Sequence, residues 1–151
     1  REHLHDCEVF ITYGGDLTEE DVESANKLKW IMVMSAGVDK MPLEACRNKG
    51  ILITNARGIH KIPMAEYTLG MMLQYEKKMK TLWENEKDEN WERRIGAGEL
   101  CGKTVLILGT GAIGGEIARL AKAFRMATIG VNRSGRKAEF FEMALAEVGL
   151  I

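Results

Sequence analysis

A glycine-rich turn between an apolar segment and a helical pattern constrains the fold of this sequence more than any other feature. The stretch VLILGTGAIGGEIARL covers residues 105–120, and its glycines Gly109, Gly111 and Gly114 are spaced as G-T-G-A-I-G. Between a strand and a helix, the first glycine permits a tight turn, the second lets the backbone approach a pyrophosphate, and the third lets the helix pack on the strand. The helix N-terminus then directs N–H groups at the phosphates. The predicted cofactor-binding residues of this turn are Gly109, Thr110, Gly111, Ala112, Ile113 and Gly114.

The segment ATIGVNR at residues 127–133 predicts the next strand, which would end beside the adenosine ribose of a bound dinucleotide. Proteins that prefer NAD usually carry Asp or Glu about 20 residues past the glycines, where it binds the ribose 2′-hydroxyl. This chain has Asn132, Arg133 and Ser134 there. Because arginine can donate charge-assisted hydrogen bonds to a 2′-phosphate, these three residues are predicted to bind the cofactor, with NADP preferred over NAD. The alternative is a solvated loop in which Arg133 contacts nothing.

Alternating strand and helix patterns precede the turn. Apolar segments rich in β-branched residues predict strands at residues 8–13, 28–34 and 51–55. Helices are predicted after Thr18, which can cap one, and after Pro42, which can open the other. The alternation predicts an α/β fold with parallel strands.

The chain is predicted to form two domains, residues 1–58 and residues 59–151. The second begins with a long helical pattern from Pro63, whose methionines and leucines fall largely on one face. The charged run at residues 84–94 then predicts a solvated helix end and loop.

Composition excludes several classes of protein. The net charge of −1 gives no electrostatic reason to expect a nucleic-acid or membrane partner. Cys7, Cys46 and Cys101 are odd in number and widely spaced, so neither a disulfide framework nor a metal site is expected, and a reducing, cytoplasmic location is predicted. No apolar run approaches the ~20 residues of a membrane-spanning helix, and residues 1–10 lack the apolar core of a signal peptide.

Longer stretches carry a family resemblance. SAGVDKMPLEACRNKGILITNARGIHKIPMAEYTLGMML is followed by LCGKTVLILGTGAIGGEIARLAKAF and GVNRSGR, and together they resemble the D-isomer-specific 2-hydroxyacid dehydrogenases over about residues 8–137. The resemblance implies a flavodoxin-like substrate-domain portion followed by the first half of a Rossmann dinucleotide-binding domain, with the active site in the cleft between them. It implies an NAD(P)-dependent oxidoreductase that transfers hydride between the cofactor and a small 2-hydroxy or 2-oxo acid, as glyoxylate and hydroxypyruvate reductases do. It also implies homodimers or larger assemblies.

The resemblance places a substrate site in this chain. Ser35, Ala36 and Gly37 match the family's loop that holds the substrate carboxylate, and Arg57 would lie near the cleft. Exposed N–H groups after a parallel strand can bind a carboxylate, and a glycine lets the ligand approach closely. His60 is predicted to be structural, because the family's catalytic histidine lies far beyond the glycine turn.

By the same resemblance, the family's catalytic Arg, Glu and His would all lie beyond Ile151. Only two Rossmann strands, residues 104–108 and 126–132, are predicted here, and the first strand of the substrate domain is expected to be missing. We therefore expect a truncated chain that is inactive by itself. Two alternatives are a non-catalytic NAD(P)-sensing protein and a self-associating fragment, because fold does not fix function. The exposed edge of strand 104–108 and the methionine-rich helix would both favour association.

Overall fold

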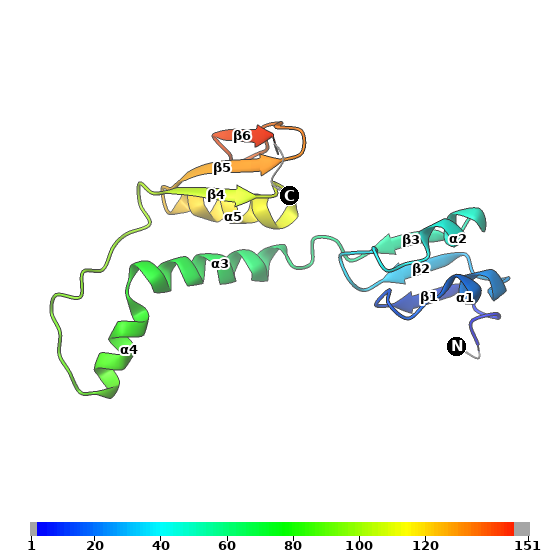
Figure 1. Ribbon diagram of the computed structural model, residues 1–151, viewed down its shortest axis with the longest axis horizontal. Coiled ribbons are helices and arrows are strands. Elements are labelled where there is room, and N and C mark those ends of the chain that lie inside the picture. The colour runs from blue at the N-terminus through cyan, green and yellow to red at the C-terminus, as the bar shows by residue number, and fades with distance from the viewer. Residues whose placement is uncertain (1–2, 147–151) are drawn as a thin grey trace. The chain divides into compact units, whose positions relative to one another are not determined.

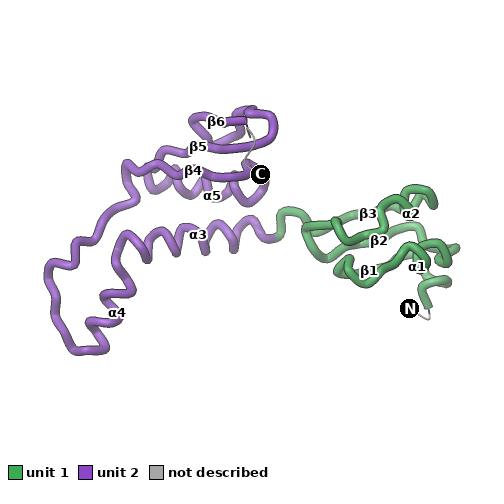
Figure 2. Tube along the Cα trace, in the orientation of Figure 1, with its two compact units in different colours: residues 1–59 green, residues 60–151 purple. Residues whose placement is uncertain are grey.

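The computed structural model describes residues 3–146. The chain divides into two compact units, residues 1–59 and residues 60–151, coloured separately in Figure 2. Each unit has its own parallel three-stranded sheet and its own buried core. The α/β class expected from the sequence is confirmed.

Unit 1 is built from three strands joined by two short helices (Figure 1). The strands pair in parallel in the order β1-β2-β3, with Val9 opposite Trp30 and Trp30 opposite Leu52. Its elements are β1 (Val9–Thr12), α1 (Glu19–Ser24), β2 (Trp30–Val33), α2 (Leu43–Asn48) and β3 (Leu52–Asn55). All five lie where the sequence predicts them.

Local signals set the limits of both helices in unit 1. Thr18 caps α1: its hydroxyl accepts a hydrogen bond from the N–H of Asp21 (3.2 Å), and the Asp21 carboxylate accepts one from the N–H of Thr18 (2.9 Å). This reciprocal pair satisfies two N–H groups that a helix start leaves unpaired. Pro42 precedes α2, and after the helix the chain turns at Gly50, whose φ of +68° favours glycine.

The core of unit 1 lies between its sheet and its helices. Ile31 and Val33 of β2 are fully buried, and they belong to the same apolar cluster as Val22 of α1 and Cys46 of α2. The central strand is therefore the element around which unit 1 packs.

Unit 2 begins with two helices and continues into a second sheet (Figure 1). Its strands are parallel, in the order β4-β5-β6. Its elements are α3 (Lys61–Glu76), α4 (Met79–Lys87), β4 (Thr104–Leu108), α5 (Ala112–Ala123), β5 (Ala127–Asn132) and β6 (Met143–Ala146). Helix α5 packs against α3, and Val105, Ile107, Ala118 and Ala121 belong to the core that includes Leu69 of α3.

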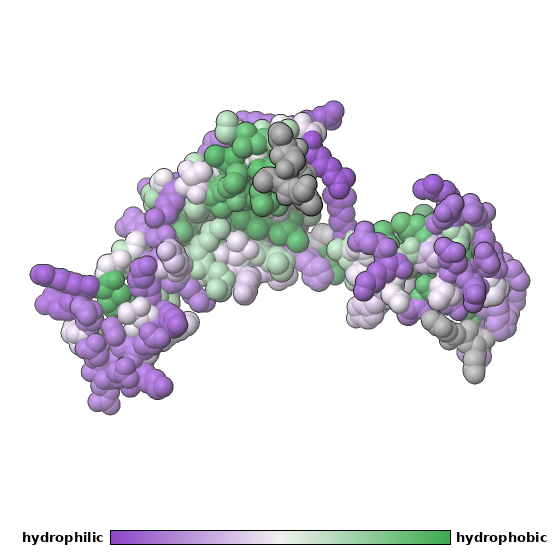
Figure 3. Space-filling view, in the orientation of Figure 1, coloured by the Kyte–Doolittle hydropathy of each residue, from purple (hydrophilic) through white to green (hydrophobic). Residues whose placement is uncertain are grey.

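The sheet of unit 2 has one covered and one exposed face. Val105 and Ile107 of β4 are buried in the core, whereas Leu106 and Leu108 are exposed, Leu108 by 72%. The strand register aligns the exposed pair with apolar residues across the sheet, in two rows: Leu106, Ile129 and Met143, and Leu108, Val131 and Leu145. Figure 3 shows an apolar patch over the strands of this unit and a hydrophilic surface around α4.

The prediction of only two strands in this domain is wrong. Residues 143–146 form a third strand, β6, which pairs with β5 from Ile129 opposite Met143 to Asn132 opposite Ala146. The sequence MALA has no β-branched residue, so its intrinsic preference gives no strand signal. The strand forms because β5 offers it a ladder of backbone hydrogen-bonding groups.

The long helical pattern from Pro63 forms two helices instead of one. Helix α3 begins at Lys61, before the proline, and ends at Glu76. Lys78 then adopts a left-handed conformation (φ 52°) and precedes α4. The charged run at residues 84–94 forms a helix end and a loop, as predicted. Helix α4 ends at Lys87, and residues 88–94 are exposed and lie outside regular secondary structure.

No helix in residues 3–146 is both long enough and apolar enough to cross a membrane. The same residues contain no group of histidine, cysteine or acidic side chains that could hold a metal ion.

Candidate functional site

The glycine turn joins β4 directly to α5. Gly109 has a φ of +96°, a conformation that residues with a side chain rarely adopt, and its N–H donates to the carbonyl of Val131 (2.8 Å). At Gly114 an added Cβ would lie 1.9 Å from the carbonyl oxygen of Gly109. A Cβ at Gly111 would meet nothing within 4 Å. The first and third glycines therefore shape the turn, and the second leaves its surface open.

The first turn of α5 presents unpaired N–H groups. Its first backbone hydrogen bond runs from the N–H of Gly115 to the carbonyl of Gly111 (2.8 Å). The N–H groups of Ala112, Ile113 and Gly114 have no recorded acceptor among residues 3–146. Since the helix dipole adds partial positive charge at this end, the three groups can bind an anion.

A pocket of about 310 Å³ lies at this helix end. Thr110, Gly111 and Ala112 line it from the glycine turn, and residues 138–140 line it from the loop that leads to β6. The remaining lining residues are Lys61, Gly115 and Glu116. The open turn, the unpaired N–H groups and this pocket together fit the diphosphate of a dinucleotide.

Asn132 ties the glycine turn to the loop after β5. Its Nδ2 donates to Thr110 Oγ1 (3.0 Å) and to the Arg136 carbonyl (2.9 Å). Its Oδ1 accepts from the N–H (3.1 Å) and the hydroxyl (3.2 Å) of Ser134. The side-chain amide thus uses both of its N–H groups and its oxygen inside the protein. Of the three residues predicted to bind the ribose end, Arg133 is the one with an exposed cationic side chain.

Sequence reasoning overlooked two further cations in this loop. Arg136 and Lys137 are exposed, and residues 132–137 contain no acidic residue. The signal was present in the letters GRK. The letters alone did not indicate a site, because the sequence does not show that Asn132 binds the Arg136 carbonyl and so brings this loop to the glycine turn.

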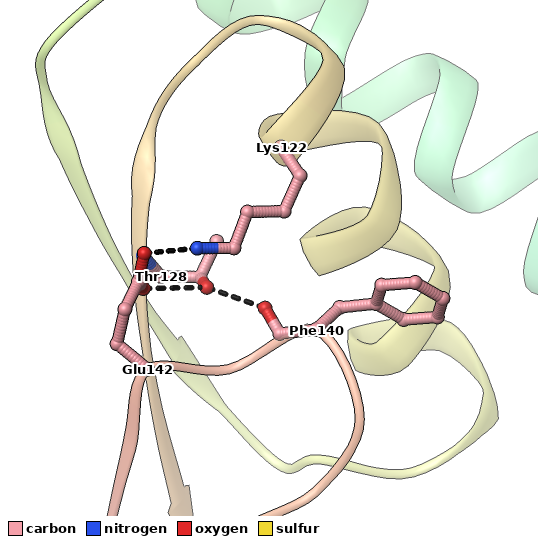
Figure 4. Close-up of polar contacts among 4 residues, drawn as sticks. All are labelled: Lys122, Thr128, Phe140 and Glu142. Atoms are coloured by element: carbon pink, nitrogen blue, oxygen red, sulfur yellow. Dashed lines mark hydrogen bonds and ion pairs between the residues drawn. The ribbon is translucent and has the colours of Figure 1, made fainter.

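The far end of the same loop is fixed by Glu142 (Figure 4). Its Oε2 accepts from the N–H of Thr128 (2.5 Å), and its Oε1 forms an ion pair with Lys122 of α5. The hydroxyl of Thr128, which is fully buried, lies 2.9 Å from Glu142 Oε2 and 2.5 Å from the Phe140 carbonyl. The Lys122 ammonium, and after it the N–H of Thr128, lowers the pKa of Glu142 from its usual 4.5 to about 2.

Replacing Glu142 with glutamine is expected to change how the stability of unit 2 depends on pH. A carboxyl group whose pKa is lowered by folding stabilises the fold above the unfolded pKa, near 4.5, and loses that contribution as the pH falls towards 2. The wild type should therefore lose more of its free energy of unfolding between pH 4.5 and pH 2 than E142Q does. Urea unfolding at a series of pH values measures both curves.

The control for this experiment is Glu139→Gln, which removes an exposed carboxylate from the same loop. Its curve should run parallel to that of the wild type. If the E142Q curve were also parallel to the wild type, the contact between Glu142 and Lys122 would not stabilise the fold.

The predicted substrate loop follows β2 in unit 1. The hydroxyl of Ser35 donates to the Gly37 carbonyl (2.7 Å), and Asn55 Nδ2 donates to the Ala36 carbonyl (2.6 Å). In a trans peptide the N–H points away from the carbonyl, so the N–H of Gly37 points away from Asn55. A pocket of about 360 Å³ lies beside this loop, lined by Tyr13, Gly14, Ser35, Gly37, Asp39 and Lys40.

The structure also brings the end of β3 to this loop. The N–H of Ala56 donates to the Ser35 carbonyl (3.1 Å), and the N–H of Arg57 is 3.4 Å from Asn55 Oδ1. The Arg57 side chain is exposed. His60 directly precedes α3, where its exposed side chain makes no capping hydrogen bond.

Comparisons with known proteins agree on one family. A profile described as "D-isomer specific 2-hydroxyacid dehydrogenase, catalytic domain" matches residues 1–147. The D-3-phosphoglycerate dehydrogenase of Methanocaldococcus jannaschii is 37% identical over 131 residues, which cover 85% of this chain and 25% of that protein.

Solved structures give the same result. A D-isomer specific 2-hydroxyacid dehydrogenase family protein from Aeromonas salmonicida is 32% identical with a TM-score of 0.80, covering 97% of this chain and 46% of that one. D-lactate dehydrogenase from Aquifex aeolicus, solved with NAD and lactic acid, is 29% identical with a TM-score of 0.75, covering 97% of this chain and 45% of that one. The chain therefore spans about a quarter of the curated relative and less than half of each structure.

Proposed function

This chain belongs to the D-isomer specific 2-hydroxyacid dehydrogenase family, and from that premise we propose that the protein is an NAD(P)-dependent oxidoreductase acting on a small 2-hydroxy or 2-oxo acid. The observation that carries the proposal is the close approach of Gly114 to the Gly109 carbonyl at the first turn of α5, whose three leading N–H groups have no acceptor among residues 3–146. The resemblance noted from the sequence is confirmed at the level of the family.

The two units have separate tasks in this proposal. Unit 1 is the substrate domain, and unit 2 binds the cofactor. The N–H groups of Ala112, Ile113 and Gly114 bind the diphosphate of the cofactor. When bound, the nicotinamide supplies or accepts the hydride.

The substrate carboxylate binds at the loop after β2. The N–H of Gly37 is its donor, and Ser35 and Asn55 hold the carbonyl groups of Gly37 and Ala36 so that this N–H stays exposed. Arg57 adds positive charge near the same loop. We assign no catalytic acid or base among the described residues. His60 lines neither pocket, and its side chain makes no capping hydrogen bond to α3.

The cofactor is proposed to be NADP in preference to NAD. Arg133, Arg136 and Lys137 are exposed around the ribose end of the site, and Asn132 occupies the position where an acidic residue would favour NAD. The test is a fluorescence titration of the wild-type protein with NADPH and with NADH. NADPH should bind more tightly, and the preference should weaken with salt, because charge pairing with an exposed phosphate is screened. If neither NADPH nor NADH bound, the proposal would be refuted.

We further propose that the protein forms homodimers or larger assemblies. The apolar face of the sheet in unit 2 and the exposed Tyr67, Tyr75 and Trp83 of α3 and α4 support association. Light scattering over a tenfold concentration range should give a mass above the 16.9 kDa of one chain. A steady mass of one chain would contradict this.

A cytoplasmic location is part of the proposal as well. Cys7, Cys46 and Cys101 are all free thiols, which suits a reducing compartment.

A further inference from the structure

Lys61 is a cation at the cofactor pocket that the glycine motif does not include. It is the first residue of α3, and it lines the same pocket of about 310 Å³ as the first turn of α5. Among the residues that line this pocket it is the one with a cationic side chain. The side chain is exposed, and no ion pair of Lys61 is recorded within residues 3–146.

Glu116, an acidic residue that lines the same pocket, already has another partner. Glu116 Oε1 accepts from Arg119 Nε (3.1 Å) and Nη2 (2.7 Å). Arg119 is the main cause of the lowered pKa of Glu116, and the charge of Lys61 contributes least. Lys61 is therefore close enough to act on the pocket electrostatically without being held by this carboxylate.

The glycine turn itself lacks positive side chains. Thr110, Ala112 and Ile113 offer a hydroxyl, a methyl group and a butyl group around backbone N–H donors. A dinucleotide diphosphate carries two negative charges, which N–H groups and a helix dipole neutralise only in part. A lysine ammonium is a compact point charge that binds phosphate oxygens well.

We propose that Lys61 is a cofactor-binding residue whose ammonium group pairs with the diphosphate at the N-terminus of α5. The inference rests on the proposed dinucleotide function and adds a residue from a different helix to that site. The two cations then bind different groups of the cofactor. Lys61 binds the diphosphate, which NADH and NADPH share, and Arg133 binds the 2′-phosphate, which only NADPH has.

The test measures the affinity of three nucleotides for the wild type and for Lys61→Gln. For NADH and NADPH, K61Q should lose affinity by the same factor, on the order of tenfold, as expected when a charged hydrogen bond is removed. Adenosine 2′-monophosphate, which has no phosphate on its 5′-hydroxyl, should bind both proteins equally. Lys61→Arg keeps the charge and should retain most of the affinity.

Lys80→Gln provides the matched control, because it removes an exposed lysine from α4 in the same unit. It should bind all three nucleotides as the wild type does. The thermal midpoint of K61Q without nucleotide should match the wild type, which separates a binding role from a structural one.

Two results would overturn the inference while leaving the dinucleotide function intact. Unchanged affinity of K61Q for NADH would show that Lys61 does not contact the diphosphate. A loss confined to NADPH and adenosine 2′-monophosphate would place Lys61 at the 2′-phosphate instead. If the wild type bound no nucleotide, the dinucleotide function and this inference would both fall.

Discussion

Replacing Gly114 with alanine is expected to destabilise unit 2 by about 1–3 kcal/mol, the usual range for overpacking, and to reduce NADPH affinity more than tenfold. The new Cβ would lie 1.9 Å from the Gly109 carbonyl oxygen, 3.1 Å from the carbonyl carbon and 3.1 Å from Ile107 Cγ2. Two of these atoms belong to the backbone, so the helix must move away from the turn. Because that movement displaces the N–H groups of the first turn of α5, stability and binding should fall together. Urea unfolding and NADPH titration measure the two effects.

Gly70→Ala is the matched control for this substitution. Gly70 lies within α3, and a Cβ there would meet nothing within 4 Å. Alanine is favoured over glycine inside a helix by about 0.5–1 kcal/mol, so G70A should be as stable as the wild type or more so. A G114A protein that unfolds and binds NADPH like G70A would show that the close contact with Gly109 does not shape the site.

Arg133→Ala is expected to weaken NADPH binding by about 1–3 kcal/mol, the range for hydrogen bonds to charged groups, and to leave NADH binding unchanged. Arg133 is exposed at the end of β5, and no acidic residue of the loop through Lys137 neutralises it. The 2′-phosphate is the one chemical difference between the two cofactors. Parallel titrations with NADPH and NADH therefore isolate the contribution of this side chain.

Arg47→Ala controls for the loss of a positive charge elsewhere, because Arg47 is exposed on α2 of unit 1. Its affinity for both cofactors should equal that of the wild type. Equal losses for NADPH and NADH in R133A would mean that Arg133 acts on the shape of the site. No loss for either would make the loop the solvated segment that the sequence also allowed.

The parts of the fold that were predictable depend on local chemistry. The Thr18 cap, the proline before α2 and the glycine turn each act within a few residues, so the letters alone reveal them. The candidate diphosphate site was accessible for the same reason. Its three glycines and the first helical turn are contiguous in the sequence.

The parts that were missed depend on contacts between distant residues. The strand β6 exists through its pairing with β5, and helix preference within MALA hid it. The break at Lys78 is a left-handed backbone conformation at a residue that gives no warning of it, because lysine rarely adopts positive φ. The hydrogen bond from Asn132 to Thr110 joins residues 22 positions apart, and Lys61, which lines the pocket from α3, is 48 positions before Gly109.

The four hydrogen bonds of Asn132 restrict how the coenzyme preference of this protein could evolve or be engineered. The obvious exchange towards NAD is an acidic residue at this position, but an aspartate side chain has no N–H groups, so the bonds that Asn132 Nδ2 donates to Thr110 Oγ1 and to the Arg136 carbonyl would be lost. The exchange would loosen the turn that both cofactors need, so a gain in selectivity would come with a loss of shared affinity. The Arg133 side chain is exposed and makes no hydrogen bond of this kind among the described residues. We therefore expect substitutions that change the coenzyme preference to occur at position 133 and its exposed neighbours. Position 132 should stay asparagine, because its side chain holds the glycine turn and the loop together.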